Sequence, residues 1–202
     1  MLRKPKFKIC RKLGPGVYEK CQTQKFTISE ARKAKASRNK RPKALSDYGQ
    51  QLVEKQKIRF SYGVSEQQFA RYIESAMNSR AVTPSIRLLE NLEMRLDNVI
   101  YRIGFAPTRA QARQMVSHGH FLVNGKKITV PSCVVNAGDK ITIREGSKGK
   151  ALFNEIEKKL KNILVPEWIK FDQKILQAEV KGKPKSLDSM FDFNAVLEFY
   201  SR

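Results

Sequence analysis

The change of apolar period between Thr83 and Glu145 constrains the fold more than any other feature of the sequence. From Thr83 to Gly104 apolar residues recur at steps of three and four, as they do on a helix. From residue 121 onward they alternate, as they do on strands. Thr83-Pro84 is a typical helix start and Gly104 is suited to a helix end. The sequence therefore predicts a helix over 83–103, before a β-rich segment.

A second helix and a small sheet are expected to follow that helix. Thr108 and Gln111 have the spacing of a capping box, and Gly119 can end the helix that they open. The stretch "FLVNGKKITV" places Asn124-Gly125, a hairpin turn, between two runs that favour strands. The stretch "CVVNAGDKITIRE" adds two more short strands around a turn. Two short helices and a small, curled antiparallel sheet are thus predicted over about 92–150.

The segments on either side are mostly helical in pattern. One helix opens at Ser46 and ends at Gly63, and the next begins at Ser65, which has the capping-box spacing to Gln68. After the sheet, "KALFNEIEKKLKNIL" predicts an amphipathic helix, and "PEWIKFD" and "ILQAEVKGKP" predict short strands. The final apolar run is "NAVLEFY".

The charge of the chain is far from balanced. Forty Lys and Arg face nineteen Asp and Glu, which gives a net charge of +21 and a sequence pI near 10.1. Such an excess repels itself in a free compact protein and favours a polyanionic partner. Residues 1–44 hold fifteen of the basic residues and only two acids. We expect this segment to be an extended arm that orders only on its partner.

Composition also argues against several classes of protein. No apolar run approaches the about 20 residues that a membrane span needs. The start "MLRKPKFKIC" is basic but lacks the apolar core of a secretory signal. Three cysteines are too few for a disulfide framework and favour a reducing compartment.

The two histidines of the chain do not predict a metal site. His118 and His120 lie two residues apart and have only Cys133 as a nearby thiol, whereas zinc needs four ligands. Cys10 and Cys21 have no second pair of ligands. The tripeptide "RLD" at Arg95–Asp97 resembles one that holds the catalytic aspartate of RNA pseudouridine synthases. Here it lies in a helical pattern, where Asp97 more plausibly caps or pairs with arginine, so we expect no enzyme.

The same region is well suited to binding an anion. Arg109 and Arg113 are four residues apart, so their side chains project from one face of a helix. The planar guanidinium fork makes bidentate contacts with phosphate. Lys126 and Lys127 follow the tight turn, and Asn124 and His118 offer uncharged hydrogen-bonding groups. These residues predict a basic shelf for phosphates.

The stretch "RLDNVIYRIGFAPTRAQARQMVSHGHFLVNGKKITVPSCVVNAGDKITIRE" closely resembles the RNA-binding module named after ribosomal protein S-four. This module also occurs in tyrosyl-tRNA synthetases, pseudouridine synthases and small heat-shock RNA-binding proteins. The flanking "LSDYGQQLVEKQKIRFSYGVSEQQFARYI" and the ending "EFYSR" are similar to the bacterial-type S-four family itself. The resemblance covers about 45–202, and the arm matches loosely in "KICRKLG".

This resemblance implies an α+β fold. A mostly helical, discontinuous domain receives the RNA-binding module as an insertion and is preceded by an extended basic arm. The expected boundaries are 1–44 for the arm, 45–91 for the first helical part, 92–151 for the module and 152–202 for the segment that returns to complete the helical domain.

The resemblance also implies a function. The family supplies a structural constituent of the small ribosomal subunit, which binds ribosomal RNA at a folded multi-helix junction and nucleates assembly of the subunit body. It implies support of translational accuracy together with ribosomal protein S-five, contact with messenger RNA where it enters the ribosome, and a cytoplasmic location. The alternatives are an RNA-modifying enzyme that uses the module as an anchor and a free regulatory RNA-binding protein.

Two departures from the family pattern affect the expected sites. Many relatives carry four N-terminal cysteines that bind zinc, whereas this arm has only Cys10 and Cys21, so we predict no zinc and no cofactor. The Pro-Gly-x-His-Gly loop of many relatives is replaced here by "SRNKRPK", residues 37–43.

The residues expected to bind RNA fall into three groups. In the module they are Arg95, Arg102, Arg109, Arg113, His118, Asn124, Lys126 and Lys127. In the helical part they are Ser46, Asp47, Tyr48, Lys55, Lys57, Arg59, Tyr62 and Arg71. In the arm they are Arg11, Lys12, Arg41 and Lys43.

Overall fold

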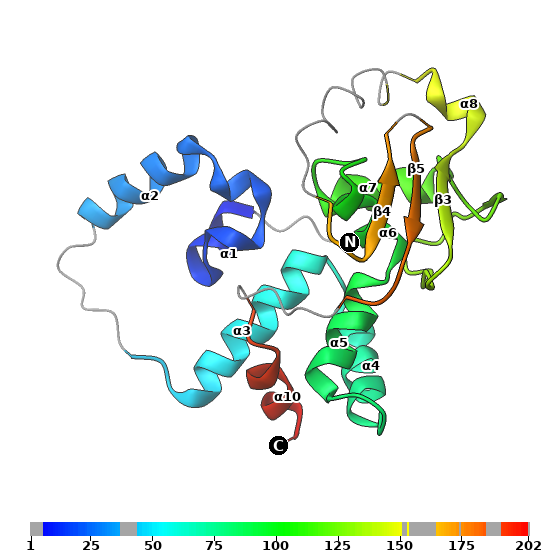
Figure 1. Cartoon of the computed structure of the whole chain (residues 1–202). Helices are drawn as coiled ribbons and strands as arrows, with labels where there is room; N and C mark the ends of the chain where they lie inside the picture. Colours follow the sequence, from blue (N-terminus) through cyan, green and yellow to red (C-terminus); the bar gives the residue numbers. More distant parts are fainter. Residues whose placement is uncertain are drawn as a thin grey trace. The chain divides into compact units, whose positions relative to one another are not determined.

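The computed structural model describes residues 6–36, 44–150, 153, 165–173, 175–184 and 191–201 (Figure 1). The chain divides into two compact units. Unit 1 comprises Met1–Ser85 and Asp188–Arg202, and unit 2 comprises Ile86–Leu187. Unit 1 is helical in its described part, and unit 2 combines helices with an antiparallel sheet. The fold is therefore α+β, as the sequence predicts.

Unit 1 is built around three helices that bury apolar stripes. These are α3 (Asp47–Tyr62), α4 (Glu66–Met77) and α10 (Phe193–Ser201). The predicted starts of α3 and α4 are correct, because the hydroxyls of Ser46 and Ser65 accept hydrogen bonds from backbone amides one turn ahead. Gly63 ends α3 in the left-handed conformation, with φ 63°.

Helix α10 is held against α3 and α4 by polar contacts as well as apolar ones. Glu66 of α4 pairs with Lys55, and it accepts hydrogen bonds from Arg59 Nη1 at 2.8 Å and from Tyr200 Oη at 2.9 Å. Burial raises the pKa of Glu66, but the contacts with Lys55, Tyr200 and Arg59 outweigh it and leave the pKa below its ordinary value. Glu66 thus links the consecutive helices α3 and α4 to α10, whose Tyr200 lies 134 residues further along the chain.

The described part of the basic arm is folded, which corrects the expected extended conformation. It contains α1 (Lys6–Leu13), two short 3-10 helices η1 (Pro15–Val17) and η2 (Glu19–Gln22), and α2 (Gln24–Ala36). Cys10 and Cys21 are joined by a disulfide and bury their side chains with Phe26 in a small core. The sequence analysis missed this pair because the turns of η1 and η2, not sequence spacing, bring the two thiols together.

Unit 2 contains a five-stranded antiparallel sheet in the order β2-β1-β3-β5-β4. Its strands are β1 (Phe121–Val123), β2 (Lys126–Lys127), β3 (Lys140–Ile143), β4 (Ile169–Asp172) and β5 (Gln177–Val180). Asn124 and Gly125 have φ of 50° and 77°, so they form the predicted hairpin turn between β1 and β2.

The two last strands extend the sheet of unit 2. Ile141 of β3 lies opposite Ala178 of β5, and Ile169 of β4 lies opposite Val180. The segment 165–184 therefore completes the sheet, whereas we had expected all of 152–202 to complete the helical domain. Only the part from Asp188 onward belongs to unit 1. The end of unit 2 depends on hydrogen bonds between strands that are distant in the sequence, and no local sequence pattern predicts those bonds.

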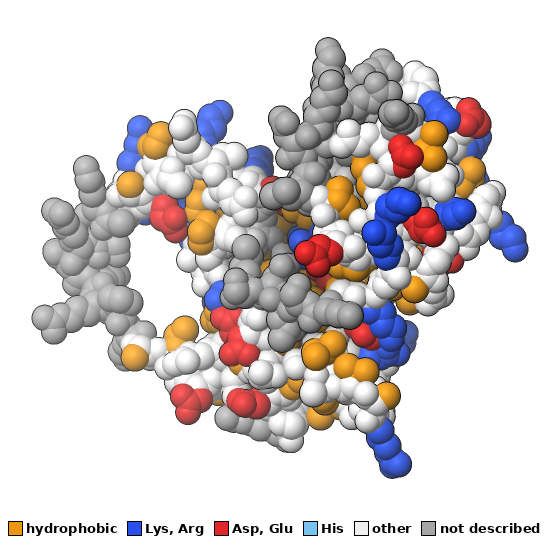
Figure 2. All heavy atoms as spheres, in the orientation of Figure 1, with side chains coloured by type: hydrophobic (Ala, Val, Ile, Leu, Met, Phe, Trp, Pro, Cys, Tyr) orange, Lys and Arg blue, Asp and Glu red, His pale blue; other side chains and the backbone are white. Residues whose placement is uncertain are grey.

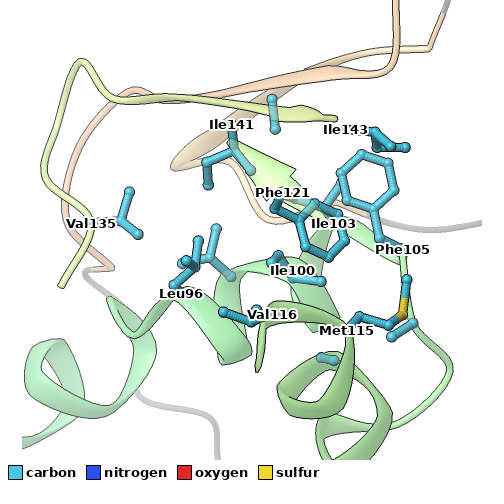
Figure 3. Packing of buried hydrophobic residues seen from close by; sticks show 14 of the residues in the cluster. Leu96, Ile100, Ile103, Phe105, Met115, Val116, Phe121, Val135, Ile141 and Ile143 are labelled. Atoms are coloured by element: carbon cyan, nitrogen blue, oxygen red, sulfur yellow. The ribbon is translucent and has the colours of Figure 1, made fainter. Parts of the chain in front are cut away.

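Among the described residues of unit 2, most of α5 (Pro84–Glu93) and all of α6, α7 and α8 accompany the sheet. Helices α6 (Leu96–Ile103) and α7 (Arg109–Ser117) pack on it, and the short α8 (Glu145–Lys148) follows β3. Apolar side chains of α6 and α7 meet those of the strands in one buried cluster (Figure 3). The labelled members of this cluster are Leu96, Ile100, Ile103, Phe105, Met115, Val116, Phe121, Val135, Ile141 and Ile143.

The single helix predicted over 83–103 is broken in two. Helix α5 (Pro84–Glu93) ends before Met94, and Arg95 is extended, with φ −72° and ψ 137°. The backbone there pairs with the loop before β3, because Val135 N donates to Met94 O and Leu96 N donates to Cys133 O. This pairing interrupts a helical apolar pattern, and it places Asp97 and Asn98 in the first turn of α6.

Two predicted features lie largely outside the described residues. They are the amphipathic helix over 150–164, of which only residues 150 and 153 are described, and the basic segment 37–43.

Candidate nucleic-acid interface

Helices α6 and α7 carry arginines at the surface of unit 2. The hydroxyl of Thr108 accepts a hydrogen bond from Gln111 N at 3.2 Å and so caps α7. Gly104 ends α6 with φ 93°. These two local signals fix where each helix begins or ends. They thereby place Arg102 at the end of α6 and Arg109 and Arg113 on α7.

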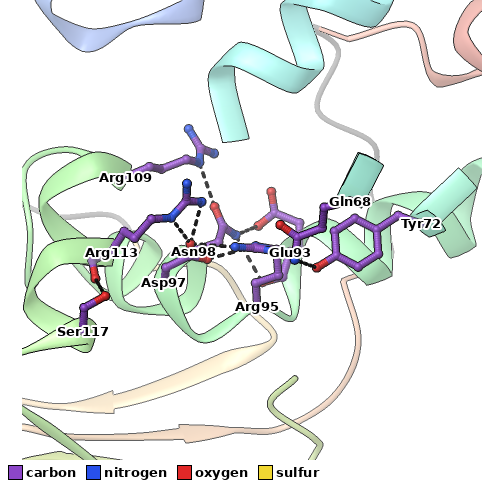
Figure 4. Close-up of polar contacts among 9 residues, drawn as sticks. All are labelled: Gln68, Tyr72, Glu93, Arg95, Asp97, Asn98, Arg109, Arg113 and Ser117. Carbon is purple, nitrogen blue, oxygen red and sulfur yellow. Dashed lines mark hydrogen bonds and ion pairs between the residues drawn. The ribbon is translucent and has the colours of Figure 1, made fainter. Parts of the chain in front are cut away.

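Two buried carboxylates contact three of the arginines in unit 2, and Figure 4 shows those of Asp97 with Arg95 and Arg113. Glu93 accepts from Arg102 Nε at 2.9 Å and from Arg102 Nη2 at 2.6 Å. Asp97 accepts from Arg113 through Nε at 2.8 Å and Nη2 at 2.7 Å. Asp97 also accepts two hydrogen bonds from Arg95, at 3.0 and 2.8 Å. The side chains of Glu93 and Asp97 are only 3% and 4% exposed.

Arg109 contacts a neutral amide and an aromatic ring. Its Nε donates to Asn98 Oδ1 at 2.7 Å, and its guanidinium carbon lies 4.4 Å from the centre of the Tyr101 ring. Asn98 also donates to Glu93 Oε2 at 2.7 Å, so it connects Arg109 to the same network. Arg102, Arg109 and Arg113 are partly exposed, and together they form an arginine row on unit 2.

Arg95 does not belong to this row. Its side chain is 2% exposed and donates two hydrogen bonds to the carboxylate of Asp97. The sequence predicts Arg95 to be an RNA-binding residue of the module, but the break at Met94–Arg95 turns it inward. Arg95 is therefore an internal counter-ion of Asp97, and its prediction as an RNA-binding residue is corrected.

The β1–β2 hairpin contributes two exposed lysines at one edge of the sheet. Lys126 and Lys127 are both exposed, and the Lys127 side chain lies across Gly119, where an added Cβ would come within 2.2 Å of its Cε. Asn124 is exposed, but its side chain donates to Asp139 and accepts from Lys140 N, so it fixes the turn. These hydrogen bonds fix the turn, so the backbone that carries Lys126 and Lys127 is held in place.

The two histidines have different surroundings. His118 is exposed at the end of α7, whereas His120 is buried and its Nδ1 lies 2.9 Å from Ser147 Oγ. Burial, and then the positive charges of Lys150, His118 and Arg144, lower the pKa of His120 below its ordinary value. His118 is accessible to a ligand, and His120 is part of the interior.

The predicted residues of unit 1 are divided between surface and interior. Ser46, Asp47, Tyr48 and Arg71 are exposed. Lys55 and Tyr62 are buried, which corrects their assignment to a ligand-facing surface. Lys55 pairs with Glu66 and lies over the rings of Phe199 and Tyr200. Both side chains stabilise the packing of the helices because they lie on the inner face of α3.

The remaining predicted residues are partly or fully accessible where the structure describes them. Lys57 pairs with Glu54, and Arg59 pairs with Glu66. In the arm, Lys12 is exposed and Arg11 donates to Ser29 Oγ at 2.9 Å. Arg41 and Lys43 lie outside the described residues.

Sequence reasoning missed Glu93, Asn98 and Tyr101 as members of the site. The network has six charged members, the two buried acids and the four arginines Arg95, Arg102, Arg109 and Arg113, so its formal charge is +2. One usable signal was present, since Glu93 and Asp97 are acids in a strongly basic chain next to an arginine-rich segment. Their partners are up to 16 residues away, so spacing alone does not reveal the pairs.

The described residues give no cluster suited to metal binding. Within these ranges no three His, Cys, Asp or Glu side chains cluster as metal ligands. Asp97, the residue in question for an RNA-modifying enzyme, is buried and its carboxylate is engaged by two arginines. Among the described helices none is long and apolar enough to cross a membrane.

Comparison with known proteins places these features in a family. Residues 1–93 match the family described as Ribosomal protein S4/S9 N-terminal domain, and residues 94–141 match the S4 domain. The chain is 41% identical over 200 residues to the small ribosomal subunit protein uS4 of Dehalococcoides mccartyi, with 96% of each chain covered. The chain belongs to the uS4 family. The uS4A protein of Alkaliphilus oremlandii is 42% identical, again over 96% of both chains.

The family membership bears on the chemistry of the site. The uS4 protein of Acidithiobacillus ferrooxidans is 40% identical over 98% of this chain and 97% of its own length. These relatives are ribosomal proteins by name. The S4 domain covers α6, α7 and the β1–β2 hairpin, so the arginine row and both lysines lie within it.

Proposed function

We propose that this chain is a structural protein of the small ribosomal subunit that binds ribosomal RNA directly. Within unit 2 the surface that contacts RNA comprises Arg102, Arg109, Arg113, His118, Lys126 and Lys127, which we call the basic face. In unit 1, the exposed Ser46, Asp47, Tyr48 and Arg71 and the partly exposed Lys57 and Arg59 add contacts. The single observation that carries the proposal is the arginine row held within an S4 domain.

We propose a finer role as well, which the same membership supports. The chain binds a folded multi-helix junction of the RNA, nucleates assembly of the subunit body, and supports translational accuracy together with ribosomal protein S-five. It contacts messenger RNA where this enters the ribosome, and it works in the cytoplasm. A net charge of +21 supports this role, because a polyanion neutralises the self-repulsion of the chain.

Binding is driven by phosphate contacts and release of counter-ions, and specificity comes from the shape of the junction. Lys and Arg side chains protrude over α2 and over the sheet unit on the visible face (Figure 2). The basic side chains on each unit support many phosphate contacts. They do not resemble a pocket that reads one base.

The first prediction concerns the lysines of the hairpin. We expect Lys126→Ala with Lys127→Ala to weaken binding to a junction fragment of small-subunit RNA and to reduce the slope of log K against log salt by about one per lost contact. These lysines are exposed and form no ion pair among the described contacts, so the melting temperature should stay nearly unchanged. Filter binding at several salt concentrations and circular dichroism measure both quantities.

Lys170 of β4 provides a matched control. It is exposed at the opposite edge of the same sheet, so Lys170→Ala, compared with Lys126→Ala or Lys127→Ala made singly, removes an equal charge away from the basic face. An equal loss of affinity from both changes would show a diffuse charge effect. A salt response that is flat for the parent chain, or equal affinity for any RNA duplex of similar length, would contradict the proposed function.

A further inference from the structure

Two acids and an amide lie directly beneath the arginine row. Glu93, Asp97 and Asn98, which we call the buried frame, are each at most 4% exposed. The side chains of Arg102 and Arg113, which they hold, remain 24% and 27% exposed. The frame is therefore inaccessible to a large ligand, while the arginines attached to it reach the surface.

The contacts fix the arginines in position and in orientation. Glu93 receives both Nε and Nη2 of Arg102, one on each carboxylate oxygen, which sets the plane of that guanidinium. Asp97 receives the same two atoms of Arg113, and Asn98 receives Nε of Arg109. A free arginine side chain loses rotamer entropy when it binds a ligand. Here that ordering is already complete in the protein, which favours binding.

We propose that Glu93, Asp97 and Asn98 are positioning residues for RNA binding, acting through Arg102, Arg113 and Arg109 respectively. This inference rests on the proposed function and goes beyond it, because it assigns a role to acids in a protein whose ligand is a polyanion. Without the frame, the same cations would still be present but would not be ordered before the RNA arrives.

The direction in which RNA affinity changes distinguishes a positioning role of these residues from an effect of their charge alone. An acid near phosphate repels it, so removing an accessible acid from an RNA-binding surface raises affinity. The substitution Glu93→Gln also adds one positive charge. Gln offers Arg102 one neutral oxygen in place of a carboxylate, so the guanidinium loses its bidentate partner. Charge alone predicts tighter binding, whereas positioning predicts weaker binding.

The experiment measures affinity of the full chain for a junction fragment of small-subunit RNA. We expect Glu93→Gln to weaken binding about three- to tenfold, the equivalent of one side chain that must be ordered on binding. Glu145→Gln is the matched control, because Glu145 is exposed, pairs only with Lys148 among the described contacts and lies in the same unit. It adds the same charge and should leave affinity unchanged or slightly higher.

A double-mutant cycle shows whether Glu93 acts through Arg102. In an Arg102→Gln background, Glu93→Gln should cause no further loss of affinity. If Glu93→Gln does not fold by circular dichroism, Asn98→Ala is tested in the same cycle with Arg109→Gln. The inference is overturned if folded Glu93→Gln or Asn98→Ala binds the fragment as tightly as the parent chain or more tightly. It is also overturned if Glu93→Gln lowers affinity as much in the Arg102→Gln background as in the parent chain. Either result leaves the proposed function intact. A parent chain that does not bind the fragment overturns both.

Discussion

Arg95 and Arg113 show that identical side chains acquire different roles from their depth in the fold. Both pair with the carboxylate of Asp97, but Arg95 is 2% exposed and Arg113 is 27% exposed. The sequence predicts that both are basic residues of a binding module. It does not predict their depth, because the inward turn of Arg95 depends on backbone pairing with the distant loop at 131–135.

A pH-dependent prediction belongs to His120. Burial and neighbouring positive charges lower its pKa in the folded chain, so at pH below about 6.5 the unfolded chain takes up the proton more readily. The contribution of neutral His120 to the free energy of unfolding is therefore fully present above about pH 6.5 and is lost as the pH falls. We expect the melting temperature to drop between about pH 7.5 and 5.5, and to drop less in His120→Asn, whose amide can still bond Ser147.

Thermal unfolding followed by circular dichroism over this pH range tests the prediction. His118→Asn is the control, because His118 is exposed and its replacement should keep most of the pH dependence. A parallel pH response in the parent and in His120→Asn would exclude His120 as its cause.

At the scale of single elements, local signals were sufficient where a helix end or a turn depends on nearby residues. The caps at Ser46, Ser65 and Thr108 and the Asn124-Gly125 turn are confirmed, because each involves a hydrogen bond or a backbone preference within a few residues. The break between α5 and α6 and the Cys10–Cys21 pair could not be predicted, because tertiary contacts produce both.

The cap of α7 gives a prediction for that helix. Thr108→Ala removes the acceptor for Gln111 N, so we expect it to lower the free energy of unfolding by about 1 kcal/mol. Because α7 carries Arg109 and Arg113, RNA affinity should fall with it. Ser117→Ala at the other end of α7 is the comparison, since its exposed hydroxyl bonds only Arg113 O among the described contacts. Urea unfolding that gives the same value for both variants would argue against the cap.

For the molecule as a whole, unit 1 depends on a helix far along the chain. Val196 of α10 is fully buried, so Val196→Asp places a carboxylate in an apolar site and should cost about 3 kcal/mol or more. We expect faster hydrogen exchange at the amides of α3, against which α10 packs. Asn194→Asp is the control, because it adds the same charge at an exposed position of the same helix. Unchanged protection of α3 in Val196→Asp would contradict the role of α10.

The division of unit 1 across the chain has a consequence for the order of synthesis. Helices α3 and α4 leave the translating ribosome early, but α10, which contacts both, is made only after Ile86–Leu187 has been added. Unit 2 can therefore complete its sheet while unit 1 still lacks α10. The part of α3 that packs on α10 therefore stays uncovered in the nascent chain until Phe193–Ser201 emerges. The unit that is begun first is the last to be finished.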